Sequence, residues 1–294
     1  MAGLRLGFIG LGALGGAIAT RLQQAGHALA VWGRNADKLA PWLAAGAAWR
    51  ATPAALAADC ECVILCVTDT AAVEEVVFGK DGVAAGATRG SILIDHSTIH
   101  PLATRGLATR LAQQATMHWL DAPVTGGVVA AVAGRLVIMA GGAAAVLERA
   151  QPIFVSYGQR VTHMGGSGAG QAAKIANQMM IGGNIAVAAE ALNYAANFGV
   201  SASLLPAALA GGWADSAVLQ HHARRMAAAD YAGEVHAAIM VKDLDIASDL
   251  GRVTTSPMPV TALVQQLYRQ LIASGAGDKG QSGLMWLYKQ KPLP

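Results

Sequence analysis

The sequence contains few charged residues, few aromatic residues and few cysteines. Only 13% of its 294 residues are charged and 5% are aromatic, whereas 54% are hydrophobic. Because low charge is combined with many apolar side chains, this composition excludes an intrinsically disordered chain. The 21 basic and 18 acidic residues give a net charge of +3, without the concentrated basic surface of a nucleic-acid-binding protein. We therefore expect a globular protein without a nucleic-acid partner.

The three cysteines, Cys60, Cys62 and Cys66, lie close together in the sequence. An odd number at this spacing fits neither a disulfide framework nor a zinc site with four ligands. They flank the apolar residues 63–65, which is typical of a buried parallel strand that uses cysteine as a small apolar residue. The histidines form no metal-binding spacing either, so we expect no metal site.

Two apolar stretches, residues 123–147 and 175–192, are long enough to be considered as membrane spans. The first contains five glycines and begins with proline, which suits strands and turns better than a spanning helix. The second contains polar side chains that are costly in lipid, namely Asn177, Gln178, Asn184 and Glu190. Residues 5–10 lack the long apolar core and cleavage site of a signal peptide. We expect a cytoplasmic protein with no membrane partner.

The first half of the chain alternates short apolar runs with helical patterns. Apolar side chains at four-residue spacing predict a helix over residues 14–25. Strands that alternate with helices are typical of βαβ units, whose strands form a parallel sheet. The predicted strands are residues 4–9, 28–32, 63–67, 91–95 and 135–139.

The pattern changes near residue 165. Residues 168–198 predict one long helix with Gly199 as its C-cap, and only helical periods follow it. We therefore expect an α/β protein in which an N-terminal parallel-sheet domain is joined by a long helix to an all-helical C-terminal domain. The predicted domains are residues 1–165 and 166–294.

A glycine-rich loop separates the first predicted strand from the first predicted helix. It follows the pattern G-x-G-x-x-G and comprises Gly10, Leu11, Gly12, Ala13, Leu14 and Gly15. In such a loop the first glycine allows a tight turn, the second lets backbone approach a pyrophosphate, and the third lets helix pack on strand. The helix N-terminus then offers N–H groups to the anion. A purely structural turn is the alternative, but the context favours dinucleotide binding by a Rossmann-type domain.

The end of the second predicted strand indicates which dinucleotide binds. An acidic residue there contacts the ribose 2′-hydroxyl of NAD, whereas an arginine accommodates the 2′-phosphate of NADP. No carboxylate occurs at residues 32–35, and Asp37 comes too late, in the next helix. Arg34, which Asn35 follows, can form a bidentate contact with phosphate. We predict NADP as the cofactor, and a solvated surface arginine is the alternative.

Thr125, Gly126 and Gly127 follow Pro123 in an apolar segment. Successive backbone N–H groups without side-chain obstruction can form a nest for an anion, and the Thr125 hydroxyl adds a donor. The pattern predicts binding of a substrate carboxylate. A tight turn that requires glycine is the alternative.

Lys174 lies in an otherwise apolar part of the long predicted helix. Burial disfavours the charged form and lowers the pKa of a lysine towards working pH, which suits acid–base catalysis. Asn177 lies three residues later on the same helix face, where it can orient a substrate or the lysine. Because a lone lysine on a helix is more often solvated, the residues alone leave both roles open.

Four blocks of sequence, taken in order, resemble the β-hydroxyacid dehydrogenases, the 3-hydroxyisobutyrate dehydrogenase-like family. The first is the glycine loop with residues 16–19, and the second is residues 121–127, DAPVTGG, where the family more often has D-A-P-V-S-G-G. The third is residues 168–178, which contain Lys174, and the fourth is residues 242–244, KDL. The resemblance covers nearly the whole chain, and four ordered blocks are specific to the family.

The resemblance implies a role for each block. It makes Lys174 the general acid and base and Asn177 its catalytic partner, with Thr125, Gly126 and Gly127 on the substrate. Many relatives have two asparagines after the lysine, whereas here Gln178 follows Asn177, so either amide is a candidate for the substrate contact. Asp243 is implied as a polar residue at the substrate site. The implied cofactor contacts are Val67, Thr68, Thr98 and Lys242, in addition to Arg34 and Asn35, which are predicted from the end of the second strand.

Two further positions bear on the substrate pocket. Relatives often have phenylalanine eight residues before Asp243, where this chain has Val235, and the smaller side chain suggests a roomier pocket. Trp213 could fill part of that volume. A tryptophan in an interface or in the core is the alternative.

The family implies reversible hydride transfer between NADP and a small β-hydroxy acid or its semialdehyde or oxo acid. The possible substrates include 3-hydroxyisobutyrate, tartronate semialdehyde, succinic semialdehyde and glyoxylate. Residues 1–165 would bind NADP, and residues 166–294 would bind substrate and form a homodimer or homotetramer. An imine reductase, which does not require this lysine, and a non-catalytic dinucleotide-binding interaction module are the alternatives.

Overall fold

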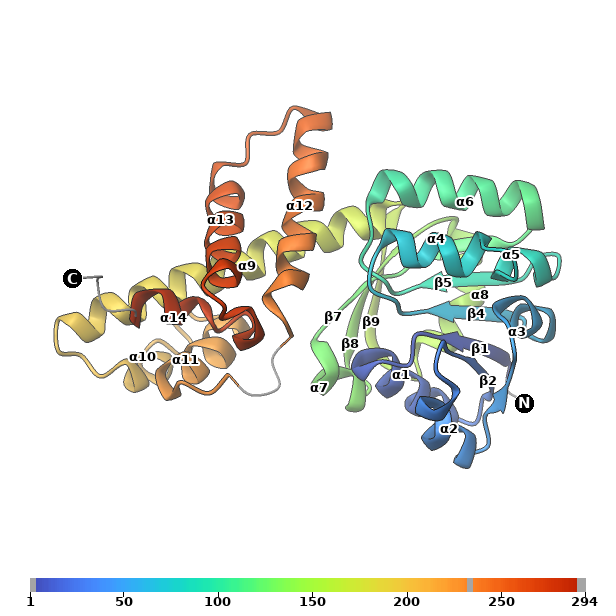
Figure 1. Ribbon diagram of the computed structural model, residues 1–294, viewed down its shortest axis with the longest axis horizontal. Coiled ribbons are helices and arrows are strands. Elements are labelled where there is room, and N and C mark those ends of the chain that lie inside the picture. The colour runs from blue at the N-terminus through green and yellow to red at the C-terminus, as the bar shows by residue number, and fades with distance from the viewer. Residues whose placement is uncertain (1–3, 232–234, 290–294) are drawn as a thin grey trace. The chain divides into compact units, whose positions relative to one another are not determined.

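The computed structural model describes residues 4–231 and 235–289 of the chain. Two compact units make up the protein, residues 1–174 and 175–294. The boundary between them lies within the long helix α9 (Ala169–Asn197), shown in yellow in Figure 1. The predicted long helix is therefore present.

The first unit alternates strands and helices along the chain (Figure 1). Its strands are β1 (Arg5–Ile9), β2 (Ala28–Trp32), β3 (Ala48–Trp49), β4 (Cys62–Leu65), β5 (Ile92–Asp95), β6 (His118–Asp121), β7 (Val124–Thr125), β8 (Leu136–Gly141) and β9 (Gly158–Gly165). Its helices are α1 (Ala13–Gln24), η1 (Ala36–Leu39), α2 (Ala40–Ala44), α3 (Pro53–Asp59), α4 (Thr70–Phe78), α5 (Val83–Gly86), α6 (Pro101–Ala115), α7 (Gly127–Val132) and α8 (Ala144–Phe154).

One sheet contains all of these strands. Its order is β3-β2-β1-β4-β5-β6-β8-β7, and β9 pairs with β8. The strands from β3 to β6 are parallel in the order 3-2-1-4-5-6 of a Rossmann domain, which confirms the predicted fold class. β8 differs from the other predicted strands because it runs antiparallel to β6 and β7. Only the short α7 connects β7 to β8, and parallel neighbours need a longer crossover.

Helices cover both faces of this sheet, so its central strands are buried on both sides. Successive strand residues point to opposite faces. Phe8 and Ile64 accordingly belong to the core under α1 and α8, whereas Ile9 and Leu65 belong to the core under α4 and α6. Figure 1 shows α4 and α6 on one side of the sheet and α1 on the other. Strands buried in this way read as continuous apolar runs, which is why the sequence identified them.

Among its described residues, the second unit contains helices and no strands, as expected. Its core gathers large side chains such as Ile185, Leu192, Met240 and Tyr268. Gly199, the predicted C-cap, has a φ of +93° and follows the last turn of α9. The remaining elements are η2 (Ala202–Leu204), α10 (Leu205–Ala208), η3 (Leu219–Ala223), α11 (Arg224–Ala228), α12 (Ala237–Thr254), α13 (Pro259–Ala273), η4 (Gly277–Lys279) and α14 (Leu284–Lys289).

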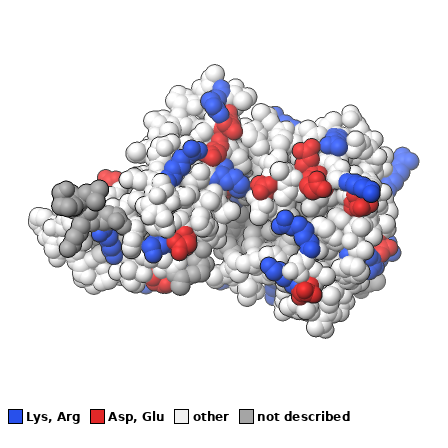
Figure 2. Space-filling model, viewed as in Figure 1, with Lys and Arg blue, Asp and Glu red and all other residues white. Residues whose placement is uncertain are grey.

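The surface carries little charge, and the charge is dispersed. Figure 2 shows acidic and basic side chains scattered among large uncharged areas on the face that it draws. Within the described part of the chain, no helix combines the length and the apolar character that a membrane span requires. The cysteines Cys60, Cys62 and Cys66 are free thiols, and burial raises the pKa of Cys60 to about 11.

A buried histidine ties three segments of the first unit together. His96 follows β5, and its Nδ1 lies 2.6 Å from the carbonyl oxygen of Ala122. A carbonyl can only accept, so Nδ1 carries the proton. The other ring nitrogen, Nε2, then accepts a hydrogen bond of 2.9 Å from the hydroxyl of Tyr157. Burial keeps the ring neutral and lowers the pKa of His96 to about 4.

This histidine makes stability depend on pH. Its pKa rises from about 4 in the folded protein to about 6.5 on unfolding, so the unfolded chain binds the proton more tightly. The contribution of neutral His96 to the free energy of unfolding is fully present above pH 6.5 and is lost as the pH falls towards 4. At 1.36 kcal/mol per unit this amounts to about 3 kcal/mol. We expect calorimetric unfolding of wild type to show this loss and the His96→Gln variant to show a shallower profile. Parallel profiles for the two proteins would contradict the assignment.

Candidate active site

The glycine loop forms a tight turn between β1 and α1. Gly10 has a φ of +98°, and a Cβ there would lie 2.1 Å from the backbone oxygen of Cys66. A Cβ on Gly15 would lie 2.0 Å from the oxygen of Gly10. Both positions therefore exclude any other residue. A Cβ on Gly12, in contrast, would meet no atom within 4 Å, so the backbone there is open to an approaching group.

The loop fits the pyrophosphate of a dinucleotide. α1 begins at Ala13, and Gly12 at its N-cap provides no side-chain cap for the N–H groups of the first turn. No acidic residue occurs in that turn. The helix dipole and the uncapped N–H groups therefore favour an anion at this end of α1. Leu11 and Leu14 lie in the same loop and are partly buried.

Arg34 and Asn35 differ in what they do. Both side chains are exposed after the carboxyl end of β2. The Asn35 side chain accepts a hydrogen bond of 3.0 Å from the backbone N–H of Asp37 and so caps η1. Arg34 forms no hydrogen bond or ion pair with any residue that the structure describes, so its guanidinium is available to a phosphate.

Val67, Thr68 and Thr98 follow the carboxyl ends of the neighbouring strands β4 and β5. The backbone N–H of Val67 donates a hydrogen bond of 3.0 Å to the hydroxyl of Ser97, which fixes the two loops together. Because β4 is also paired in parallel with β1, both loops lie at the carboxyl ends of the strands, where the glycine loop begins as well. In doubly wound sheets, ligands bind outside the carboxyl ends of the strands.

The segment from Thr125 to Gly127 changes direction at two glycines. Thr125 ends β7, Gly126 has a φ of +117° and Gly127 has a φ of +65°. These left-handed conformations favour glycine, and a Cβ on Gly127 would meet no atom within 4 Å. A cavity of about 370 Å³ opens beside Thr125 and Gly126, and the exposed side chain of Arg135 lines it. The backbone here is therefore accessible, with a cation nearby.

A buried carboxylate connects this segment to the start of α9. Asp121, the last residue of β6, accepts hydrogen bonds from the backbone N–H of Gly168 at 2.8 Å and of Gln171 at 2.9 Å. Burial raises the pKa of the Asp121 carboxyl, and the bonds from Gly168 and Gln171 oppose that shift. Because the carboxylate lies at a helix N-terminus, the helix dipole adds to its stabilisation. The segment and the helix are thus held by one side chain.

The side chain of Gln171 adds a second attachment for α9. Its Oε1 accepts a hydrogen bond of 3.1 Å from the backbone N–H of Ile99, and its Nε2 donates one of 2.7 Å to the backbone oxygen of Ser97. Gln171 is completely buried. The loop that contains Thr98 is therefore fixed to the same helix turn as Asp121.

Lys174 follows Gln171 by one helical turn and is only 9% exposed. It is the last residue of the first unit. Ile175 beside it is buried as well, and so are the polar side chains Gln171 and Gln178, one turn away on either side.

Two hydrogen bonds and an ion pair link four predicted site residues in the second unit. Gln178 on α9 donates a hydrogen bond of 2.6 Å from Nε2 to Oδ2 of Asp243 on α12. Asn177 donates one of 2.9 Å from Nδ2 to Oε1 of Gln178. Lys242 pairs with the other carboxylate oxygen of Asp243 at 3.1 Å. Gln178 and Asp243 are buried, whereas Asn177 is partly exposed.

Trp213 and Val235 both lie at the surface of the second unit. Trp213 is fully exposed and Val235 is largely exposed, so Trp213 is not a core tryptophan. Among the described residues no group of histidine, cysteine and acidic side chains is arranged to hold a metal ion.

Sequence reasoning missed the residues that hold the site together. Asp121 was identified only as the first letter of its block, Gln171 only as part of the helical block, and His96 not at all. A carboxylate directly after the buried apolar residues Trp119 and Leu120 is the signal that could have identified Asp121. The partners of Gln171 and His96 lie 72 and 61 positions away in the chain, so no local pattern contains them.

Two protein families match the chain, and together they cover most of it. Residues 5–166 match the NAD binding domain of 6-phosphogluconate dehydrogenase. Residues 168–288 match the domain described as NAD-binding of NADP-dependent 3-hydroxyisobutyrate dehydrogenase. The junction between the two matches falls just before α9.

Two enzymes of Escherichia coli (strain K12) resemble the chain over nearly its full length. The 2-hydroxy-3-oxopropionate reductase is 36% identical over 284 residues, which are 96% of each chain. The 3-sulfolactaldehyde reductase is 33% identical over 290 residues, covering 95% of this chain and 94% of the enzyme.

Solved structures resemble the fold in the same way. A 3-hydroxyisobutyrate dehydrogenase from Salmonella typhimurium has a TM-score of 0.88 and 28% identity, covering 97% of this chain and 99% of that one. An imine reductase from Pseudomonas sp. has a TM-score of 0.64 and 19% identity, covering 98% and 100%. The second likeness concerns the fold alone.

The Asp121 carboxylate provides a test of how the site is assembled. In Asp121→Asn, one acceptor oxygen becomes an NH₂ group that cannot accept from a backbone N–H. We expect a loss of about 1–3 kcal/mol in unfolding free energy. We also expect faster amide hydrogen exchange at Gly168 and Gln171. Calorimetry and exchange measured by mass spectrometry check the two expectations.

The matched control is Asp37→Asn, which changes an exposed carboxylate of the same unit and should leave both quantities unchanged. If the amides of Gly168 and Gln171 exchange as slowly in Asp121→Asn as in wild type, the carboxylate does not hold α9.

Proposed function

The chain belongs to the β-hydroxyacid dehydrogenase family and is an oxidoreductase with a nicotinamide dinucleotide cofactor, and we propose that it interconverts a small β-hydroxy acid and its semialdehyde or oxo acid with NADP. In this proposal residues 1–165 bind the cofactor, and residues 166–294 complete the substrate site and form the subunit contacts. The observation that carries the proposal is the shared attachment at Asp121. It joins the strand that precedes Thr125 to the helix that carries Lys174.

NADP is proposed over NAD because of the residues after β2. Residues 32–35 provide no carboxylate for a ribose 2′-hydroxyl, and the guanidinium of Arg34 suits a 2′-phosphate. The match to an NADP-dependent dehydrogenase domain adds support. The pyrophosphate would lie on Gly10, Leu11, Gly12, Ala13, Leu14 and Gly15, and the further contacts would come from Asn35, Val67, Thr68, Thr98 and Lys242. When bound, the reduced nicotinamide supplies a hydride for the carbonyl carbon.

The substrate carboxylate is assigned to the backbone of Thr125, Gly126 and Gly127. The two left-handed glycines leave the backbone accessible, and the Thr125 hydroxyl adds a donor. A small acid that is anchored there leaves its carbonyl or hydroxyl end free to meet a proton donor. The two reductases that resemble the chain are named for substrates that carry an acidic group and an aldehyde.

Lys174 is assigned as the general acid and base. In the direction of reduction it donates a proton to the carbonyl oxygen, and in the direction of oxidation it takes that proton back from the hydroxyl. Its burial on α9 suits this role, since solvent then competes less for the proton. No other lysine of α9 exists.

Between Asn177 and Gln178, we assign the substrate contact to Asn177. The Asp243 carboxylate can only accept, so it fixes Nε2 of Gln178 towards itself and leaves Oε1 for Asn177. Gln178 is therefore committed to internal hydrogen bonds. Asn177 is held in one orientation and is still partly exposed, as a residue that orients a substrate must be. Asp243 acts through this chain of amides.

We propose a homodimer or homotetramer formed through α9. Met180, Val187 and Tyr194 are spaced by seven residues, and Phe198 continues the same helix face. These apolar side chains are 67–84% exposed. A continuous apolar patch of this kind is rare on a monomer and is typical of a surface that a partner covers. A second copy of the chain would bury this stripe.

The lysine assignment predicts a large kinetic effect with little effect on binding. Lys174→Met keeps the buried aliphatic stem but has no proton to transfer. We expect kcat to fall by at least about a hundredfold, as acid–base groups typically contribute, while the Kd for NADPH stays within about twofold. Steady-state NADP⁺ reduction should be followed with 3-hydroxyisobutyrate, and NADPH oxidation with tartronate semialdehyde, succinic semialdehyde and glyoxylate.

Near-normal turnover of Lys174→Met would remove the lysine from the mechanism. Wild-type activity on cyclic imines, without activity on these acids and aldehydes, would favour an imine reductase. No hydride transfer in either direction with any of these compounds would favour a non-catalytic dinucleotide-binding module.

The cofactor assignment predicts a change that is specific to NADP. Arg34→Gln removes a charge that would pair with the 2′-phosphate, and a hydrogen bond to a charged group contributes about 1.5–3 kcal/mol. We expect kcat/KM for NADPH to fall at least about tenfold, since 1.4 kcal/mol is a factor of ten, and kcat/KM for NADH to stay the same. Lys38→Gln, on the exposed helix that follows, is the matched control. Wild type that uses NADH as well as NADPH would refute the preference.

The oligomer is tested by placing charge on the exposed stripe. Val187→Glu combined with Tyr194→Glu should convert the assembly to monomers because two carboxylates would be buried against the partner. Val253→Glu, at an exposed apolar position of α12, is the control and should keep the wild-type mass. Light scattering after gel filtration measures the masses. A monomeric wild type would contradict the proposal.

A further inference from the structure

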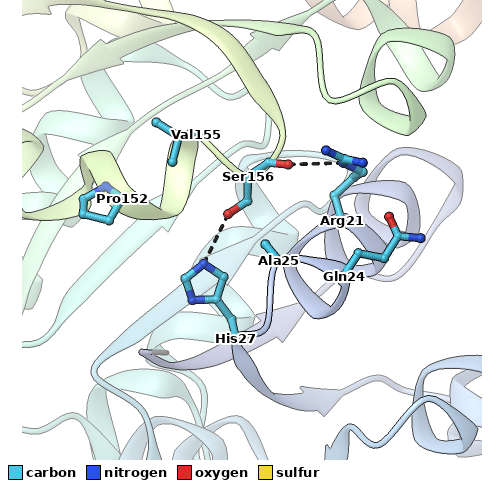
Figure 3. A pocket seen from close by; sticks show the side chains of 7 residues that line it. All are labelled: Arg21, Gln24, Ala25, His27, Pro152, Val155 and Ser156. Atoms are coloured by element: carbon cyan, nitrogen blue, oxygen red, sulfur yellow. Dashed lines mark hydrogen bonds between the residues drawn. The ribbon is translucent and has the colours of Figure 1, made fainter. Parts of the chain in front are cut away.

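A second cavity lies within the first unit, outside the candidate active site (Figure 3). Its volume is about 370 Å³. Three elements meet there: the end of α1, the residues just before β2, and the turn between α8 and β9. The side chains that line it are Arg21, Gln24, Ala25, His27, Pro152, Val155 and Ser156.

This cavity is separate from the glycine loop. Gly10–Gly15 precede and begin α1, whereas Arg21 and Ala25 are in its last turn and at its C-cap. A helix of this length spans about 18 Å. The carbonyl groups that end α1 are already used, because Ala25, Gly26 and His27 donate their N–H groups to them. The negative end of the helix is therefore capped.

Arg21 presents a fixed positive charge to the cavity. Its Nε donates a hydrogen bond of 3.2 Å to the backbone oxygen of Ser156. The guanidinium also lies against Gly134, where a Cβ would come within 2.8 Å of Nη2. No acidic side chain of the described residues pairs with it, and none lines the cavity. The charge is thus oriented without being neutralised.

Two further polar groups face the same space. The hydroxyl of Ser156 lies 3.2 Å from Nε2 of His27, and Figure 3 shows Arg21 and His27 approaching Ser156 from two directions. Nδ1 of His27 is buried and has no hydrogen-bond partner within the described part of the chain. Burial lowers the pKa of His27, so the imidazole is neutral and the guanidinium is the sole charge.

Part of the cavity lining is apolar. Ala25, Pro152 and Val155 form it, and Val155 is 66% exposed. An arginine beside an aliphatic wall suits a ligand that carries both an anionic group and a short hydrocarbon part, because each end then has a matching surface. A bare inorganic anion would leave the apolar wall without a contact.

We propose that this cavity binds a short aliphatic carboxylate, with the carboxylate paired to the Arg21 guanidinium near the Ser156 hydroxyl and the hydrocarbon part against Pro152 and Val155. The site does not overlap the loop assigned to the dinucleotide. Binding there is therefore compatible with a bound cofactor.

Butyrate is the probe, added to the full-length chain in the presence of saturating NADPH. The backbone amide shifts of Ala25 and Ser156 are followed in a ¹⁵N-resolved spectrum, which separates this cavity from the substrate site. We expect saturable shifts for wild type. In Arg21→Gln, which keeps a donor for the Ser156 oxygen but removes the charge, the Kd should rise at least tenfold.

Arg160→Gln removes an exposed arginine elsewhere in the same unit and should leave the Kd within twofold. Val155→Glu is a second variant for the case that Arg21→Gln does not fold. It keeps Arg21 and places a carboxylate at the exposed rim of the cavity, where it would repel a bound carboxylate. It should weaken butyrate at least tenfold. Unchanged binding in Val155→Glu or in folded Arg21→Gln, or no saturable shift in wild type, would overturn the proposal. Inorganic phosphate that binds as tightly as butyrate would overturn the ligand class.

Discussion

The hydrogen bonds of a single buried carboxylate determine where the two halves of the candidate catalytic machinery lie. Asp121 ends β6, and its two oxygens accept the backbone N–H groups of Gly168 and Gln171 at the start of α9. The glycine pair that would hold a substrate and the lysine that would exchange a proton come from segments about fifty residues apart in sequence. Hydrogen bonds to a charged acceptor are strong, so these two bonds fix the distance between the end of the strand and the start of the helix.

Other polar groups extend this attachment rather than replace it. Gln171 fixes the loop that contains Thr98, and His96 fixes Ala122, which directly follows Asp121. Farther along α9, Asp243 orients Gln178, which in turn orients Asn177. His96, Gln171, Gln178 and Asp243 are buried, and each forms a hydrogen bond with a neighbouring segment or side chain. Preorganisation of this kind is what acid–base catalysis needs, since the proton donor must meet its acceptor at hydrogen-bond distance.

Much of the fold was predictable because its physical causes are local. The runs around Phe8 and Ile64 are continuous and apolar since helices cover both sheet faces, and Gly10–Gly15 fit a turn that only glycine allows at two positions. Gly199 ended the long helix as expected. The direction of β8 was not predictable from its apolar run, because an isolated run does not show its neighbours.

The candidate site likewise contains residues that the sequence identifies and residues that it does not. Lys174 and Thr125 could be identified from their blocks, but the buried partners Asp121, Gln171 and His96 could not be assigned roles, since their contacts join segments far apart in sequence.

The most direct test of the proposed catalytic arrangement is a crystal structure with NADPH and a small β-hydroxy acid. We expect the carboxylate on the backbone N–H groups of residues 125–127 and Nζ of Lys174 within about 3.2 Å of the hydroxyl oxygen. A lysine that points to solvent, or a carboxylate bound elsewhere, would contradict the account.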